Sequence, residues 1–517
     1  ISPFQKELVM LKSRRFWIAG VLVLIVFTLC FPLFTLRESS AHEAFDTLPD
    51  FPCYRTLDTV FSDAASLAIN HPNLAEWLDI GDSWIKQNSG GTSGYDLNIL
   101  KLTNKNTSGI KPVLFVMSAL HARDLAPVEL NLHFAEHLLS GYGSNPEITW
   151  LLDETEIHFL LVANPDGRAV VEEQIASGWA GADGMNARMK NLNATTCPTQ
   201  PSNTGTDLRR NFSVEWAGGY SGCTNIYSGT YALSEPESSS IQAYLDDIFL
   251  DYRDGDPSEP VHTGATSLFL NIESFGDTIT YPFYYTANPA PEEAELYILA
   301  NKLAYDLDAF PDNPDALLHG TPEDYVYGEL GIPALAYAIG GSSEGQYFMN
   351  CWDFDHDLNA NLNMLIRAAK ASFAPYSLPA GPEITSFSIQ SDLENRQTNW
   401  FLSAIAKNNL YKLPLAPSPI VASAVYSFDL APWQEGAVLH DLQPEDGFWD
   451  EAEEALFAEL DVSTLQPGQH RVYVQAALVN GTSGLASAGT ITITLEPLPT
   501  STPIVDGYDN YLPIINK

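Results

Sequence analysis

Hydrophobic residues follow two alternating patterns along the first three quarters of the chain. Continuous apolar runs, typical of buried strands, occur at 113–119, 157–163, 267–272 and 333–339. Between these runs, apolar residues recur every three or four positions, which predicts helices over 127–139, 291–310 and 357–372. A further helix is expected to open at a capping box, Ser234-Glu-Pro-Glu237. Strands that alternate with helices predict an α/β domain with a mostly parallel sheet and helices on both of its faces.

The pattern changes after a Pro- and Gly-rich segment at 379–383, which we interpret as a linker that ends an α/β domain spanning 46–378. Beyond it, short strands alternate apolar and polar residues, as in Val472/Val474/Ala476, and turn residues separate them. This pattern of short, alternating strands predicts an immunoglobulin-like β-sandwich over 384–496. The last residues, 497–517, form a Pro/Ser/Thr-rich tail.

The N-terminal segment carries the features of a secretory signal. Three basic residues precede an uncharged apolar run at 16–36, and a small-residue patch, Ser39-Ser40-Ala41, follows it. The run is also long enough to span a bilayer. Residues 1–45 are therefore expected to be a signal peptide or a retained signal anchor, and the protein to be secreted or at the cell surface.

Charge and cysteine content fit an exported protein. The chain has 65 acidic and 25 basic residues, a formal net charge of −40, so nucleic-acid binding is excluded as a main role. The acidity is interpreted as a solvated surface. Beyond the signal segment there is an even number of cysteines, which suits two disulfides: Cys53, Cys197, Cys223 and Cys351.

Polar motifs lie where the predicted strands end, which is where open parallel sheets place their functional crevice. Four motifs follow strands: His121-Ala-Arg-Asp124, Asn164-Pro-Asp-Gly167, Asn271-Ile-Glu-Ser-Phe-Gly276 and Tyr337-Ala-Ile-Gly340. A loop between the second and the third of these holds a fifth motif, Gly205-Thr-Asp-Leu-Arg-Arg-Asn-Phe212. Their order resembles the zinc carboxypeptidase family (carboxypeptidase A/B type), whose members read H-x-x-E, N-P-D-G, G-V-D-L-N-R-N-F, H-S-Y and F-E-L. The resemblance covers about residues 50–378 and includes Tyr325 to Pro333.

This resemblance implies a fold and a reaction. The family has a central mixed sheet of about eight strands with helices on both faces, and it releases C-terminal amino acids from peptides with the help of zinc. A disulfide brackets the Arg-Arg-Asn loop in the family, which implies Cys197–Cys223. The pair Cys53–Cys351 is then expected as the second disulfide.

The positions of the metal ligands depart from the family pattern. The first histidine stands as His121, but the glutamate of H-x-x-E is Asp124 and the later histidine is Glu273. One imidazole and two carboxylates are a set that zinc uses less often and that harder cations also accept. We therefore expect zinc to bind weakly or not at all.

The catalytic positions depart further. The glutamate that activates water in the family corresponds to Ala338, the tyrosine that closes over the substrate to Ala316, and the oxyanion-stabilising arginine to Met189. Loss of a general base alone costs about 10²- to 10⁴-fold in rate. Two residues near these positions could act as substitutes: Glu344 for the base and Arg188 for the arginine.

Residues for binding a peptide remain. Arg123 matches an arginine that contacts substrate in the family, and Arg209 and Arg210 stand where the substrate carboxylate is gripped, although the family has asparagine at the position of Arg209. The planar arginine fork binds a carboxylate through two hydrogen bonds. Glu323 falls near the family's side-chain specificity pocket and would suit a basic side chain.

Three hypotheses follow. The first is a secreted, catalytically impaired pseudoenzyme that binds peptide or protein C-termini, with association with the cell surface as a further expectation and its oligomeric state left open. The second is an active metallocarboxypeptidase with unusual His/Asp/Glu metal ligands. The third, supported only by the sandwich pattern, makes the C-terminal domain an adhesion or carbohydrate-binding module.

Overall fold

The computed structural model describes residues 46–253, 256–262, 264–313, 317–341, 346–394, 397–415 and 419–494. The predicted signal segment, the tail at 497–517, Ala316 and Glu344 lie outside these residues. Within the described residues, no helix is both long enough and apolar enough to cross a membrane.

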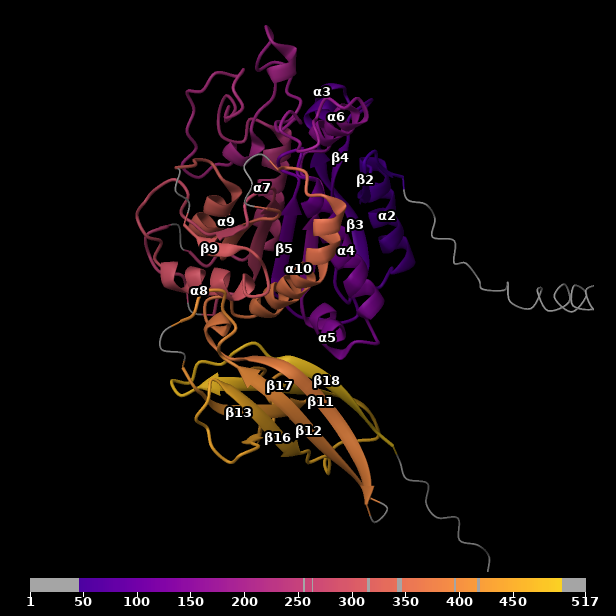
Figure 1. Ribbon diagram of the computed structural model, residues 1–517, viewed down its shortest axis with the longest axis vertical. Coiled ribbons are helices and arrows are strands. Elements are labelled where there is room, and N and C mark those ends of the chain that lie inside the picture. Colours follow the sequence, from indigo (N-terminus) through magenta and orange to yellow (C-terminus); the bar gives the residue numbers. More distant parts are fainter. Residues whose placement is uncertain are drawn as a thin grey trace, which may run out of the picture. The chain divides into compact units, whose positions relative to one another are not determined.

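An eight-stranded mixed sheet forms the centre of the first domain (Figure 1). Its strand order is β3-β4-β6-β5-β7-β10-β8-β9. The central strands β6, β5, β7 and β10 run parallel, whereas β3, β4 and β8 make antiparallel pairs. The bounds are β3 (Ala75–Asp82), β4 (Asp96–Leu102), β5 (Val113–Ser118), β6 (Glu156–Leu160), β7 (Leu268–Glu273), β8 (Thr278–Thr280), β9 (Phe310–Asp312) and β10 (Ala334–Ala338). The predicted mixed eight-stranded sheet is confirmed.

Helices flank this sheet, and α10 packs against α4 (Figure 1). Their bounds are α2 (Leu57–Asn70), α3 (Trp84–Asn88), α4 (Leu125–Gly141), α5 (Pro146–Glu154), α6 (Pro165–Ala176), α7 (Pro236–Ile248), α8 (Glu293–Leu303), α9 (Pro322–Leu330) and α10 (Cys351–Ala371). The central strands supply much of the core: β5 and β10 are buried along their whole length, and β6 and β7 at all but one residue each. Phe115 of β5 and Phe269 of β7, for example, stack at 5.6 Å with no exposed surface.

Two local predictions need correction. The helix predicted over 291–310 ends at Leu303, because the following residues turn so that β9 can pair with β8 at the sheet edge. The capping box at the start of α7 does not form. The Asn211 side chain takes its place: its Nδ2 donates to Ser234 Oγ at 3.1 Å, and its Oδ1 accepts from the Glu235 N–H at 3.1 Å.

A β-sandwich of two four-stranded sheets follows, as predicted. One sheet has the order β11-β12-β16-β15 and the other β14-β13-β17-β18. The bounds are β11 (Glu383–Glu394), β12 (Gln397–Lys407), β13 (Val421–Phe428), β14 (His440–Asp441), β15 (Gln443–Pro444), β16 (Glu453–Glu459), β17 (Gly468–Leu478) and β18 (Ser487–Ile493). Every second residue of β16 is buried, since one face of this sheet packs on the other.

The sandwich and the α/β domain belong to one compact unit, 47–517. Trp150 of α5 is 1% exposed, and the rings of Phe373, Trp433 and Tyr473 lie 5.4, 6.1 and 5.7 Å from its ring. Beside this cluster, Arg471 Nη2 lies 2.6 Å from Asp153 Oδ2. Aromatic packing and an ion pair therefore hold the second domain on the first.

Both predicted disulfides are present. Cys53–Cys351 joins β2 (Phe51–Arg55), which pairs with β1 (Thr47–Leu48), to the start of α10. Cys197–Cys223 closes the long segment between α6 and α7. The described residues also include the short 3₁₀ helices η2 (Pro201–Asn203), η3 (Leu208–Arg210) and η4 (Leu378–Ala380).

Candidate active site

The sequence motifs meet where the central strands end. Glu273 is the last residue of β7, and Ala338, the last residue of β10, is its partner in the parallel ladder. His121 and Asp124 lie between β5 and α4, and Asp124 is the N-cap position of α4. Parallel strands bring their carboxyl ends to one edge, so residues far apart in the sequence become neighbours.

His121 is held by a carboxylate. Its Nε2 lies 3.0 Å from Asp207 Oδ1, and Asp207 also accepts from Arg210 Nε at 3.1 Å. Burial of His121 lowers the pKa of its imidazole, but Asp207 outweighs this effect and the pKa stands above its usual value. A carboxylate on one ring nitrogen fixes the ring and leaves the other nitrogen, Nδ1, as the one that a metal could use.

Asp124 is buried without a regular partner. Its exposed fraction is 0%, and neither carboxylate oxygen accepts a hydrogen bond of normal geometry, although the Ser274 N–H lies near enough to lower its pKa. Burial dominates and raises the pKa of this carboxyl to about 7. A buried carboxyl group in this state is a good acceptor for a ligand, a water molecule or an ion.

Arg209 lies against two carboxylates. Its Nη1 is 2.6 Å from Glu273 Oε1, and its Nη2 is 3.6 Å from Glu323 Oε1. Asn271 Nδ2 donates to the same Glu323 oxygen at 2.8 Å. Burial raises the pKa of Glu273, and Arg209 opposes that rise. The Arg209 guanidinium is therefore already engaged within the protein and does not face a substrate carboxylate.

The three residues predicted as metal ligands are neighbours that do not form a ligand set. Across the described ranges, no three His, Cys, Asp or Glu side chains are grouped as they would be around a metal ion. The reason is local: Glu273 is turned to Arg209, and a guanidinium at that position repels a second cation. His121 and Asp124 have features of ligands, but the three-residue set does not fit the metal.

The catalytic positions carry no replacement group in the described residues. Ala338 ends β10 as a buried methyl group, and Met189 Sδ lies 3.6 Å from Arg123 Nη2. Arg188, weighed as a substitute for the lost arginine, donates instead to the backbone carbonyls of Lys190, Asn191 and Thr204. Arg188 therefore stabilises its loop and does not face the site.

Two further cations line the site. Arg123 stacks on the ring of Tyr347 at 3.3 Å, and Tyr347 meets Phe275 edge to face at 4.9 Å. Arg210 bonds to Asp207 through Nε, and in the part of the chain that the structure describes its two Nη groups have no protein partner. Sequence reasoning missed Tyr347 and Phe275. The position of Phe275, directly after Glu273-Ser274, could have indicated its place in the site from the sequence. Tyr347 lies in none of the sequence motifs, so the sequence offered no such signal for it.

Unpartnered buried acceptors gather here. Among the residues that the structure describes, none provides a hydrogen bond of normal geometry to either Asp124 oxygen, Asn271 Oδ1, Glu323 Oε2 or Asp324 Oδ2. Because buried polar groups are nearly always bonded, this concentration indicates a place that takes water or a polar ligand.

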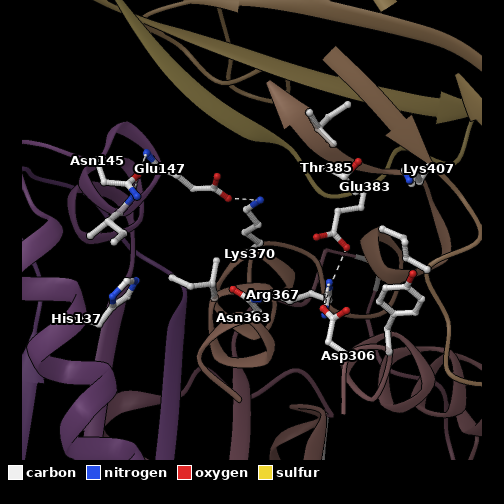
Figure 2. A pocket seen from close by; sticks show the side chains of 15 residues that line it. His137, Asn145, Glu147, Asp306, Asn363, Arg367, Lys370, Glu383, Thr385 and Lys407 are labelled. Carbon is white, nitrogen blue, oxygen red and sulfur yellow. Dashed lines mark hydrogen bonds and ion pairs between the residues drawn. The ribbon is translucent and has the colours of Figure 1, made fainter. Parts of the chain in front are cut away.

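A polar cavity of about 490 Å³ lies elsewhere in the molecule, between α5, α10 and β11 (Figure 2). Its charged groups pair with one another: Lys370 with Glu147, and Arg367 with Glu383 at 2.9 Å and Asp306 at 3.1 Å. None of its lining residues belongs to the motifs at the strand ends. We therefore take the cluster around His121 as the candidate active site.

The fold and this cluster define a peptidase-type α/β protein, and comparison with known proteins gives the family. A family model described as zinc carboxypeptidase matches residues 62–364, more than half of the chain, so the chain belongs to the zinc carboxypeptidase family.

Individual relatives agree with this assignment. Carboxypeptidase A1 of Bos taurus is 27% identical over 301 residues, which is 58% of this chain and 60% of the relative. Carboxypeptidase A2 of Rattus norvegicus is 25% identical over 334 residues, 64% of this chain and 66% of the relative. The chain thus spans less than two thirds of the length of these relatives. A crystal structure of thrombin activatable fibrinolysis inhibitor shares the fold, with a TM-score of 0.52 and 19% identity over 62% of this chain and 74% of that one.

Proposed function

We propose that this protein is an exported member of the zinc carboxypeptidase family that binds peptide or protein C-termini and has lost efficient hydrolysis. The observation that carries the proposal is the pair formed by Ala338 and Glu273. The position of the family's water-activating glutamate holds a methyl group, and the carboxylate beside it is bonded to Arg209. Among the described residues of the site, no carboxylate stands free in the place of the base.

Recognition of a C-terminal carboxylate would fall to Arg210. Within the described residues its Nη groups have no protein partner, its side chain is 19% exposed, and its Nε donates to Asp207. An anchored guanidinium loses little freedom when it forms two parallel hydrogen bonds to a carboxylate. Arg123, held on Tyr347, would contact the peptide backbone. The Glu323 side chain is 0% exposed and lies 3.6 Å from Arg209, so selection of a basic side chain is not part of this proposal.

The proposed binding function does not depend on a metal ion. A zinc ion in a family site supplies Lewis-acid activation of water. Here the third ligand position is paired with Arg209, so no step is assigned to a metal. The binding function requires only the cations and the apolar rings that line the site.

Export is supported by two features. The predicted signal at the N-terminus would direct the chain out of the cytoplasm. Two disulfides, Cys53–Cys351 and Cys197–Cys223, suit an oxidising compartment. Association with the cell surface remains part of the same proposal.

Fluorescence anisotropy with labelled peptides tests the binding function. A peptide with a free C-terminal carboxylate should bind at least about tenfold more tightly than its C-terminal amide, because the amide loses charge-assisted hydrogen bonds. Arg210→Ala should remove that preference, whereas Lys407→Ala, a change at a surface ion pair of the sandwich, should keep it. Equal binding of acid and amide would contradict the proposal. Peptide hydrolysis that a chelator abolishes and zinc restores would support the active enzyme instead.

A further inference from the structure

Two departures from the family pattern lie in contact with each other. The family has asparagine at the position of Arg209 and histidine at that of Glu273, and here these two side chains form an ion pair at 2.6 Å. Without Arg209, Glu273 would be a buried carboxylate with no ion-pair partner among the described residues, which is strongly unfavourable. Together they form a neutral pair, so each change compensates the other.

We propose that the Arg209 guanidinium is a resident cation that replaces the charge of the metal, so that this site is complete and stable without a metal ion. The inference does not rest on peptide binding. It concerns what neutralises the carboxylates of the site, and it would hold whether or not a peptide is the ligand.

The surroundings of Arg209 support this role. The side chains of Glu273 and Glu323 are 15% and 0% exposed, and Arg209 itself is 13% exposed, so solvent screens the three charges only weakly. One guanidinium reaches both carboxylates, as a bound cation would. Asn271 and the ring of Tyr284, 5.5 Å from Arg209, complete the enclosure.

The remaining charges are balanced in a second group. Asp207 lies between His121 and Arg210, so the imidazole and one arginine share a single carboxylate. Within the described residues, Asp124 forms no ion pair, and neither of its carboxylate oxygens has a hydrogen-bond partner of normal geometry. A divalent cation at His121 and Asp124 would therefore need Glu273 as well, and it could obtain Glu273 only by displacing Arg209.

Zinc binding and thermal unfolding of the full chain test the inference. For the unmodified protein, we expect dialysis against a chelator and later addition of zinc to leave the unfolding midpoint unchanged. Arg209→Asn should lower the midpoint, because it leaves Glu273 and Glu323 unpaired, and added zinc should restore it. By isothermal titration, zinc should bind this variant at least about 100-fold more tightly than the unmodified chain, since a repelling cation has gone.

Two control variants separate this inference from general destabilisation. Arg209→Lys keeps the cation and should show no response to zinc. Arg367→Asn removes an arginine that likewise lies between two carboxylates, Glu383 and Asp306, in the cavity of Figure 2. It should lower the midpoint, and zinc should not restore it, because the histidine of this cavity, His137, lies on its other side near Asn145 and not beside Glu383 and Asp306 (Figure 2).

Two results would overturn the inference. One is an unmodified protein that keeps stoichiometric zinc through purification and loses stability when the zinc is removed. The other is an Arg209→Asn variant whose midpoint and zinc affinity equal those of the unmodified chain. Neither readout involves peptides, so failure here and failure of the proposed function are distinguishable.

Discussion

Ala338 and Glu273 are register partners across the parallel ladder between β10 and β7, at the ends of both strands. This pairing puts the position of the family's catalytic base next to the position of its third metal ligand. Both positions have changed, one to a methyl group and the other to a carboxylate bonded to Arg209. The proposed loss of catalysis would therefore involve neighbouring groups that act as a unit.

Hydrolysis should return only when Arg209, Glu273 and Ala338 are all changed to the residues that the family has at these positions. The unmodified protein, and the variant Ala338→Glu, should release C-terminal residues at background rates. The triple variant Arg209→Asn/Glu273→His/Ala338→Glu should show zinc-dependent release, because it returns the ligand, the base and a neutral neighbour. A matched triple variant with Ala338→Gln has the same volume without the base and should be slower by about 10²- to 10⁴-fold. Mass spectrometry of peptide products measures this. Activity of the unmodified protein would refute the prediction.

The Cys53–Cys351 disulfide should be a main contributor to stability. It closes a loop with a sequence separation of 298 and fixes β2 to the start of α10. Replacing both cysteines with serine should lower the free energy of unfolding by about 2–5 kcal/mol. Urea denaturation of the double variant measures the change. The disulfide Cys197–Cys223 closes a shorter loop, with a sequence separation of 26. Replacing these two cysteines with serine should therefore lower the free energy of unfolding by less. A larger loss for the shorter loop would contradict this order.

Tyr473 should couple the sandwich to the α/β domain. It has no exposed surface, packs against Trp150, and donates its hydroxyl hydrogen to Glu154 Oε1 at 2.9 Å. Tyr473→Ala should cost about 3–5 kcal/mol, and Tyr473→Phe, which keeps the ring, about 1 kcal/mol. Both domains should lose stability in the alanine variant. Calorimetry would contradict this if the α/β domain kept its original transition.

The stability of the protein should fall as the pH rises, through Asp324. Burial raises the pKa of this carboxyl to about 7, and its Oδ2 has no partner. In the unfolded chain the group ionises near its ordinary pKa, so between about pH 4 and pH 7 the unfolded state binds fewer protons than the folded state. The raised pKa therefore stabilises the folded state fully below about pH 4. This contribution to the free energy of unfolding, at most about 4 kcal/mol, is lost as the pH rises to about 7.

Asp324→Asn tests the sign of this effect. The variant should match the unmodified protein near pH 4 and be more stable near pH 8, because the amide cannot ionise. Asp450→Asn changes an exposed aspartate and should follow the unmodified profile at both values. Urea unfolding across the pH range measures the difference. Parallel profiles for the unmodified protein and Asp324→Asn would show that the Asp324 carboxyl does not titrate as described.

The sequence by itself determined the fold class and the family. Buried strands such as 113–119 are continuous apolar runs, a local property that needs no knowledge of the rest of the chain. The order of the motifs, four at strand ends and one in a loop, identified the family and the positions that had changed, Ala338 and Glu273 among them. The disulfide pairs followed from an even number of cysteines and the family precedent.

The tertiary structure alone decided what the changed residues do. Arg209 and Glu273 lie 64 positions apart, and nothing in either segment indicates that the two side chains meet. The same holds for Tyr347 beneath Arg123, and for Asn211, which takes the place of the expected capping box. Ion pairs and caps of this kind depend on side-chain directions in three dimensions. A chemical pattern along the chain specifies which groups are present, and packing specifies which of them are free to act.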